Sequence, residues 1–260
     1  MRCSLACLCA LSVPFAALLG QGNTPVPPAP QRATPAAGSQ GQGAAPAPQQ
    51  PNPPSAAAPL APQEQLALRP RPADLAALFA LLGRATGLEA EFREEKHLAL
   101  LAVPLQSRGR LYFLPPGYLT RVVEAPEPAT LSITPKELRL QNRDGTEVVD
   151  LQRSDKMRTF VAALVQVFAA DRAGLEKAFT LGYRVPEGDE RTWTLVLVPR
   201  GKPLDQLLAR LELHGRGEAV QRIEMHEPGG DRTVTTIVSA DPQRRFDPAE
   251  QQRWFGIAAK

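Results

Sequence analysis

The spacing of hydrophobic residues along this chain alternates between a helical period and an extended one. Downstream of Pro72, apolar residues with helical spacing predict an amphipathic helix that runs roughly to Lys96. The residues that define this first helix are Leu75, Leu78, Phe79 and Leu82. A second helix has the most regular apolar stripe in the chain, and Ser154 and Asp155 suit its N-terminus. Its stripe consists of Met157, Phe160, Val161, Leu164, Val165 and Phe168.

Short runs with a period of two predict a long antiparallel sheet on both sides of the second helix. Six runs precede it, at residues 98–105, 110–114, 118–125, 130–134, 138–142 and 147–152. Five more follow a short helical turn at residues 172–178, and they cover residues 179–185, 191–198, 207–213, 220–227 and 233–239. Turns rich in Gly, Pro, Asn and Asp separate the runs, so we expect about eleven strands.

Two helices inserted around such a sheet predict an α+β fold, with a strongly curved sheet whose concave face is covered by helices. Asp247 and Pro248 look like the cap and the first position of a short terminal helix that reaches Phe255. We therefore assign residues 73–240 to one folded domain, and residues 241–260 to a C-terminal extension that contains the short helix.

The first residues have the pattern of a secretory signal. Arg2 precedes an apolar run at residues 5–19, and the small residues Gly20 and Gly22 follow it. This order predicts a cleaved signal peptide at residues 1–22 and therefore export. An uncleaved anchor is the alternative, although the run is short for a membrane span.

Proline is concentrated in the segment that follows. The chain has 260 residues and 27 prolines, and about half of the prolines fall between Pro25 and Pro72. Residues 23–72 are otherwise mostly Ala, Gln, Gly and Ser, so we expect a disordered linker that has little to bury. The linker is either a tether to a membrane or a passive leader.

Residues suited to catalysis or metal binding are scarce in the predicted domain. All three cysteines lie in the first nine residues, and only three histidines are present. Glu94 and His97 form a Glu-x-x-His motif, which can place a carboxylate and an imidazole on one face of a helix. A di-iron site needs two copies of this motif, and the chain has one. His214 and His226 lie on strands whose pairing around Arg216 would not place them opposite each other. We expect no metal, no cofactor and no enzymatic activity.

Charge and apolar content bear on whether the domain could bind a nucleic acid or a lipid. The 30 basic residues are interleaved with 27 acidic ones, for a net charge of +3, so we expect no nucleic-acid partner. The strands at residues 111–114 and 193–198 are apolar on both faces. Either the sheet simply packs on helices, or it encloses a cavity for a lipid chain, where each methylene sheltered from water contributes about 0.8 kcal/mol.

Two ordered stretches of motifs resemble the LolA-like outer-membrane lipoprotein carriers, of the LolA/LolB-type lipid-binding superfamily. The first runs from Phe92 through Lys96 and continues with Pro104-Leu105, Gly109-x-Leu111-x-Phe113, Pro116, Leu119 and Pro126. The second comprises Phe179, Trp193-x-Leu195-x-Leu197-x-Pro199, Ile223 and Gly230-Asp231-Arg232-Thr233. Together these stretches cover nearly all of residues 73–240.

The resemblance implies an incomplete antiparallel β-barrel with an α-helical lid over an apolar cavity. In this chain the lid would include Phe160, Leu164 and Phe168. The residues expected to line the cavity are Leu111, Phe113, Leu119, Leu131, Trp193, Leu195 and Ile223. One departure concerns Leu114 and Pro115, which stand where the carriers have an Arg with a role in lid closure and cargo release. This departure favours a related lipid or acyl cargo.

The resemblance implies a carrier function in the periplasm, and two other functions stay open. The first hypothesis is a monomeric carrier in the periplasm of a Gram-negative bacterium, which takes an acylated lipoprotein or lipid from a membrane donor to an acceptor at the outer membrane. The second is a lipid-sensing or assembly module on the same scaffold that binds a partner protein. The third is a hydrolase with an unrecognised site.

Overall fold

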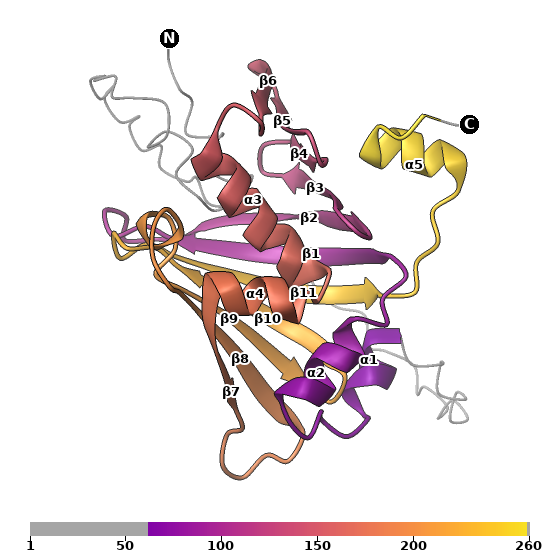
Figure 1. Ribbon diagram of the computed structural model, residues 1–260, viewed down its shortest axis with the longest axis vertical. Helices are drawn as coiled ribbons and strands as arrows, with labels where there is room; N and C mark the ends of the chain where they lie inside the picture. Colours follow the sequence, from indigo (N-terminus) through magenta and orange to yellow (C-terminus); the bar gives the residue numbers. More distant parts are fainter. Residues whose placement is uncertain (1–61, 259–260) are drawn as a thin grey trace, which may run out of the picture.

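A single antiparallel sheet of eleven strands dominates the computed structural model, which describes residues 62–258 (Figure 1). The strands are β1 (Leu88–His97), β2 (Leu105–Leu114), β3 (Tyr118–Ala125), β4 (Ala129–Ile133), β5 (Glu137–Asn142), β6 (Gly145–Asp150), β7 (Phe179–Arg184), β8 (Thr192–Pro199), β9 (Arg210–Arg216), β10 (Ala219–His226) and β11 (Arg232–Asp241). The helices are α1 (Pro62–Ala67), α2 (Leu75–Leu82), α3 (Asp155–Phe168), α4 (Arg172–Ala178) and α5 (Pro248–Phe255), with a 3-10 turn at Leu204–Gln206. None of the helices in the described range is long and apolar enough to cross a membrane.

Two meanders make up the sheet, and they meet where β1 pairs with β11. The order is β6-β5-β4-β3-β2-β1-β11-β10-β9-β8-β7, so β6 and β7 form its edges. The chain crosses from one edge to the other through α3 and α4, which lie over the concave face (Figure 1). The sheet is therefore curved and open, which confirms the α+β class and the expected incomplete barrel.

The sequence prediction was wrong at the start of the domain. The predicted first helix ends early, because α2 stops at Gly83 and residues 88–97 form strand β1. Buried and exposed positions alternate along β1, but the buried ones include Glu94 and Lys96, so the period of two is hidden in a run of charges. The predicted strand at residues 98–105 is mostly a loop, and β2 begins at Leu105. The total of eleven strands is nevertheless correct.

Residues 62–72, which the sequence places in the predicted linker, contact the sheet. Residues 1–61 lie outside the described residues, and they hold the predicted signal peptide and most of the predicted linker. Residues 62–67 form α1, where the side-chain amide of Gln63 donates a hydrogen bond to the carbonyl of Val220 at 2.8 Å. Further along, the hydroxyl of Tyr183 donates to the carbonyl of Pro72 at 2.6 Å. These contacts hold residues 62–72 against the sheet.

The two faces of the sheet are covered by different helices. On the concave face, α3 begins after Ser154, whose hydroxyl accepts the backbone N–H of Met157 at 3.3 Å, and buries its apolar stripe. On the convex face, the ring of Trp254 in α5 stacks on Tyr112 of β2 at 4.2 Å. The terminal helix predicted after Asp247 is present, and Asp247 and Glu250 form its capping box.

We predict that Gly215→Ala destabilises the fold. A Cβ atom at Gly215 would lie 2.0 Å from Cζ2 of the buried Trp193 ring, so the ring would have to move. Overpacking of this kind costs about 1–3 kcal/mol, which urea unfolding should record as a lower midpoint. Gly182→Ala is the matched control, since its Cβ would lie 3.8 Å from Cβ of Val196, an ordinary contact. Equal midpoints for the two variants would contradict this account of the packing.

Candidate functional site

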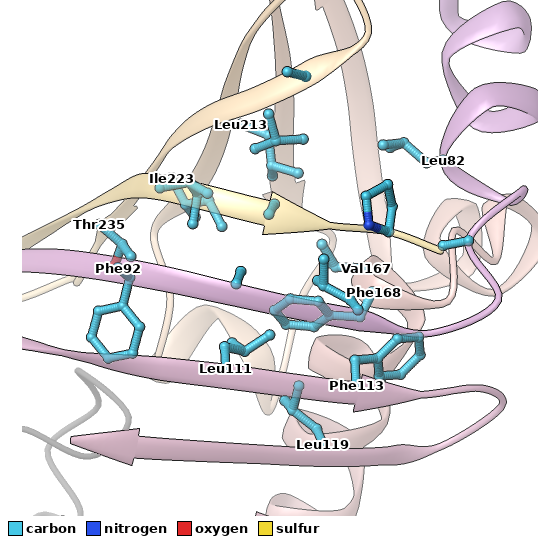
Figure 2. A pocket seen from close by; sticks show the side chains of 18 of the residues that line it. Leu82, Phe92, Leu111, Phe113, Leu119, Val167, Phe168, Leu213, Ile223 and Thr235 are labelled. Carbon is cyan, nitrogen blue, oxygen red and sulfur yellow. The ribbon is translucent and has the colours of Figure 1, made fainter. Parts of the chain in front are cut away.

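A cavity of about 480 Å³ lies between the concave face of the sheet and helix α3. Its walls are mainly aliphatic and aromatic side chains from both meanders and from α2 and α3 (Figure 2). This volume is within the range of small-molecule sites, which are usually concave and mostly apolar. The arrangement is suited to an elongated apolar ligand.

The register of the strands explains why these side chains converge. Alternate residues of a strand point to the same face, so Leu111 and Phe113 of β2 both face the concave side. Phe113 pairs with Leu119 on β3 in the register of the sheet. Leu131 on β4 continues the same face, and all four side chains line the cavity.

Five of the seven residues predicted for the lining do line the cavity: Leu111, Phe113, Leu119, Leu131 and Ile223. Trp193 and Leu195 do not, because both are buried in the packed core of the second meander. The indole N–H of Trp193 donates a hydrogen bond to the carbonyl of Gly217 at 2.9 Å, which fixes the ring beside Gly215. Leu195 pairs with Leu213 across β8 and β9. The alternation of apolar residues predicts which side chains face inward. It does not predict which of them border the cavity and which are covered by other side chains.

The three residues predicted for the lid all border the cavity. Phe160, Leu164 and Phe168 project from α3, together with Val167. The ring of Phe168 lies 5.7 Å from that of Phe113, centroid to centroid, so α3 contacts the sheet across the cavity. Figure 2 shows Phe168 and Phe113 side by side at one end.

Polar side chains that sequence reasoning missed lie at the other end of the cavity. The carboxylate of Glu94 lies 2.8 Å from a guanidinium nitrogen of Arg121, and both side chains are more than nine-tenths buried. The hydroxyl of Thr235 donates to Glu94 at 2.9 Å. The Arg121 guanidinium also lies over the ring of Phe92, 4.4 Å from its centroid. We call Glu94, Arg121, Thr233 and Thr235, which all border the cavity, the polar layer.

A second buried ion pair lies next to the polar layer. Nζ of Lys96 lies 3.2 Å from the carboxylate of Glu227, and both side chains are almost fully buried. Burial raises the pKa of Glu227, and the nearby Lys96 only partly opposes that shift. The sequence prediction had placed Glu94 and Lys96 at the end of the first helix, so their burial became visible only once β1 was known to be a strand.

The histidines lie outside the cavity. His214 pairs with Arg222 and His226 with Arg210, so the two are not opposite each other, as predicted. Each has a ring nitrogen within 3.6 Å of the Glu224 carboxylate. Burial and the nearby Arg210 lower the pKa of His226. Residues 62–258 contain no group of three His, Cys, Asp or Glu side chains that could hold a metal ion.

We predict that Glu94→Gln is strongly destabilising. The change removes the carboxylate that faces the buried Arg121 guanidinium, and breaking a buried pair from one side costs about 3–5 kcal/mol. Glu137→Gln is the control, because the Glu137 carboxylate pairs with Arg139 at 2.8 Å on the surface, where such pairs contribute up to about 1 kcal/mol. Urea unfolding should separate the two variants. Similar free energies of unfolding would mean that the Glu94 pair contributes little.

Comparison with known proteins gives one family and several distant structures. A family model described as "Outer membrane lipoprotein carrier protein LolA-like" matches residues 67–248, which is well over half of the chain. A search of curated proteins found no match.

The structures similar to this chain share little sequence with it. A LolA superfamily protein from Nitrosomonas europaea has 10% identity over 66% of this chain and 94% of its own, with a TM-score of 0.39. A DUF1329 family protein from Desulfovibrio piger has 12% identity over 73% of this chain and 97% of its own, with a TM-score of 0.41. The MucA/MucB complex of Pseudomonas aeruginosa has 12% identity over 64% of this chain and 55% of its own, with a TM-score of 0.38.

Proposed function

The chain belongs to the LolA-like family of outer membrane lipoprotein carrier proteins, and on that basis we propose that it is a periplasmic carrier for acyl chains. It binds the acyl chains of a lipid or lipoprotein in the cavity under α3 and delivers them toward the outer membrane. The single observation that supports this proposal most is the apolar cavity of about 480 Å³. The predicted signal peptide agrees with export.

The chemistry of the cavity wall supports an acyl ligand. Leu111, Leu131 and Ile223 supply aliphatic surface from both meanders, and Leu164 supplies it from α3. Each methylene moved from water into such surroundings contributes about 0.8 kcal/mol, so a chain of sixteen carbons would contribute on the order of 10 kcal/mol. Such a gain is enough to take a chain from water, while a membrane offers a comparable environment for release.

The turn between β2 and β3 favours a cargo other than a typical lipoprotein. Pro115 stands there, where the resemblance places an Arg that acts in lid closure and release in the lipoprotein carriers. Pro115 has no charge and no side-chain donor, so it cannot supply that function. We therefore propose a free lipid or another acylated molecule as the cargo.

The loop between β1 and β2 supports delivery to a membrane. Residues 98–104 carry no charged side chain, and Leu100 is 97% exposed and Val103 72% exposed. The carboxylate of Asp231 accepts a hydrogen bond from the backbone N–H of Ala99 at 2.9 Å, which attaches the base of the loop to the β10–β11 turn. Neighbouring exposed apolar side chains at the tip of a hairpin suit contact with lipid, because such groupings are uncommon on surfaces that face only water.

We predict that Leu164→Glu abolishes acyl binding while the sheet remains folded. The new carboxylate would border the apolar cavity, where the loss of its hydration is costly. Ala162→Glu is the matched control, because Ala162 lies on the exposed side of the same helix. The readouts are native mass spectrometry after expression in a Gram-negative host and titration with a fluorescent fatty acid. Equal binding by Leu164→Glu and the parent would place the ligand elsewhere.

An absence of bound or titratable acyl ligand in the parent would reject the carrier proposal itself. In that case, capture of a regulatory partner without ligand transfer would support the lipid-sensing or assembly module. Turnover of acyl esters that is lost on changing one Ser or His would support the hydrolase.

We predict that Leu100→Asp combined with Val103→Asp slows delivery several-fold without weakening acyl binding. Charged side chains at the loop tip would oppose its entry into the membrane interface. The measurement is the rate at which a bound fluorescent fatty acid transfers to phosphatidylethanolamine–phosphatidylglycerol vesicles. Val148→Asp, at an exposed valine on β6, is the control and should transfer at the parental rate. A parental rate in the double variant would exclude the loop from delivery.

A further inference from the structure

The cavity is chemically divided along its length. Figure 2 shows Thr235 beside Phe92 at one end, and Leu82, Phe113 and Phe168 toward the other. Beyond Phe92, the next inward-facing residue of β1 is Glu94, which pairs with Thr235 of β11, and the one after it is Lys96, which pairs with Thr233. An apolar chain lying in the cavity would therefore meet hydrogen-bonding groups at this end.

The charges at this end already oppose one another in pairs. The Glu94 carboxylate faces the Arg121 guanidinium at 2.8 Å, and Lys96 faces Glu227 at 3.2 Å. The two cations and two carboxylates sum to zero, so an added anion would lose its hydration without gaining net opposite charge. The polar layer is consequently better suited to an uncharged group than to a carboxylate or phosphate.

Thr233 provides the observation that points to a ligand. Thr233 as a whole residue is 2% exposed, and it borders the cavity. Its hydroxyl oxygen has no hydrogen-bond partner within residues 62–258, although Thr235, two residues along the same face, donates to Glu94. Buried hydroxyls in proteins are nearly always hydrogen-bonded, so an unpartnered one at a cavity wall calls for a partner inside the cavity.

Resting on the carrier function above, we propose that the cargo bears an uncharged hydrogen-bonding group, such as a hydroxyl or an ester or amide carbonyl, within its buried apolar portion. This group binds at the polar layer and hydrogen-bonds the hydroxyl of Thr233. Thr233 is then a specificity residue, since it selects functionalised chains over plain ones. The Phe92 side of the cavity holds the adjoining methylenes.

Titration of two defined probes tests this assignment. Hexadecane and hexadecan-1-ol differ only in a terminal hydroxyl, which reaches the polar layer when the methyl end lies toward Phe113 and Phe168. The parent should bind the alcohol at least as tightly as the alkane, because Thr233 offsets the lost hydration of the hydroxyl. Thr233→Val should weaken binding of the alcohol about tenfold, the effect of leaving one buried hydroxyl unpaired, and should leave binding of the alkane unchanged.

Two further variants control for effects on folding. Thr233→Ser keeps the hydroxyl and should keep the parental ratio of affinities, whereas Thr233→Ala should behave like Thr233→Val. Binding of the alkane verifies in each variant that the cavity is intact. An affinity ratio that is the same in the parent, Thr233→Val and Thr233→Ala would overturn this inference alone. Failure of the parent to bind either probe would overturn the carrier function and this inference with it.

Discussion

The pairing of β1 with β11 joins the first and last strands of the sheet, and the rest of the architecture depends on it. The two meanders are each local, with neighbouring strands consecutive in sequence, so this pairing is what makes them one sheet. The register shifts between Glu91 and Phe92, where β11 has one extra residue, Val238. Such a bulge increases local twist, and it lets both Ile237 and Ala240, three residues apart on β11, border the cavity.

A cavity remains because the sheet is curved and its side chains do not fill the space between its concave face and α3. Leu111 and Phe113 on one meander face Leu213 and Ile223 on the other, and α3 covers the space between them. On the convex face, in contrast, α5 packs directly on the sheet near β2, β3 and β4, and its Trp254 stacks on Tyr112. The space that could hold a ligand lies on the concave side, under α3.

Much of this arrangement could be predicted from the sequence, because most strands alternate clearly and α3 has a continuous apolar stripe. The prediction failed at β1, where inward positions hold Glu94 and Lys96, and hydropathy does not distinguish a buried charge from an exposed one. The structure places Trp193 in the packed core, and alternation identifies the inner face of a strand but not whether a side chain there meets a cavity or the core. The partner of a buried charge, here Arg121, depends on register between strands and is not present in local sequence.

The unpaired edges at β6 and β7 have a consequence for the size of the cavity. In a closed barrel the circumference is set by the ladder of hydrogen bonds, so the interior has one volume. Here no ladder joins β6 to β7, so the curvature of the sheet is not fixed by closure. The volume of the cavity depends instead on the side chains that pack between the two meanders and α3.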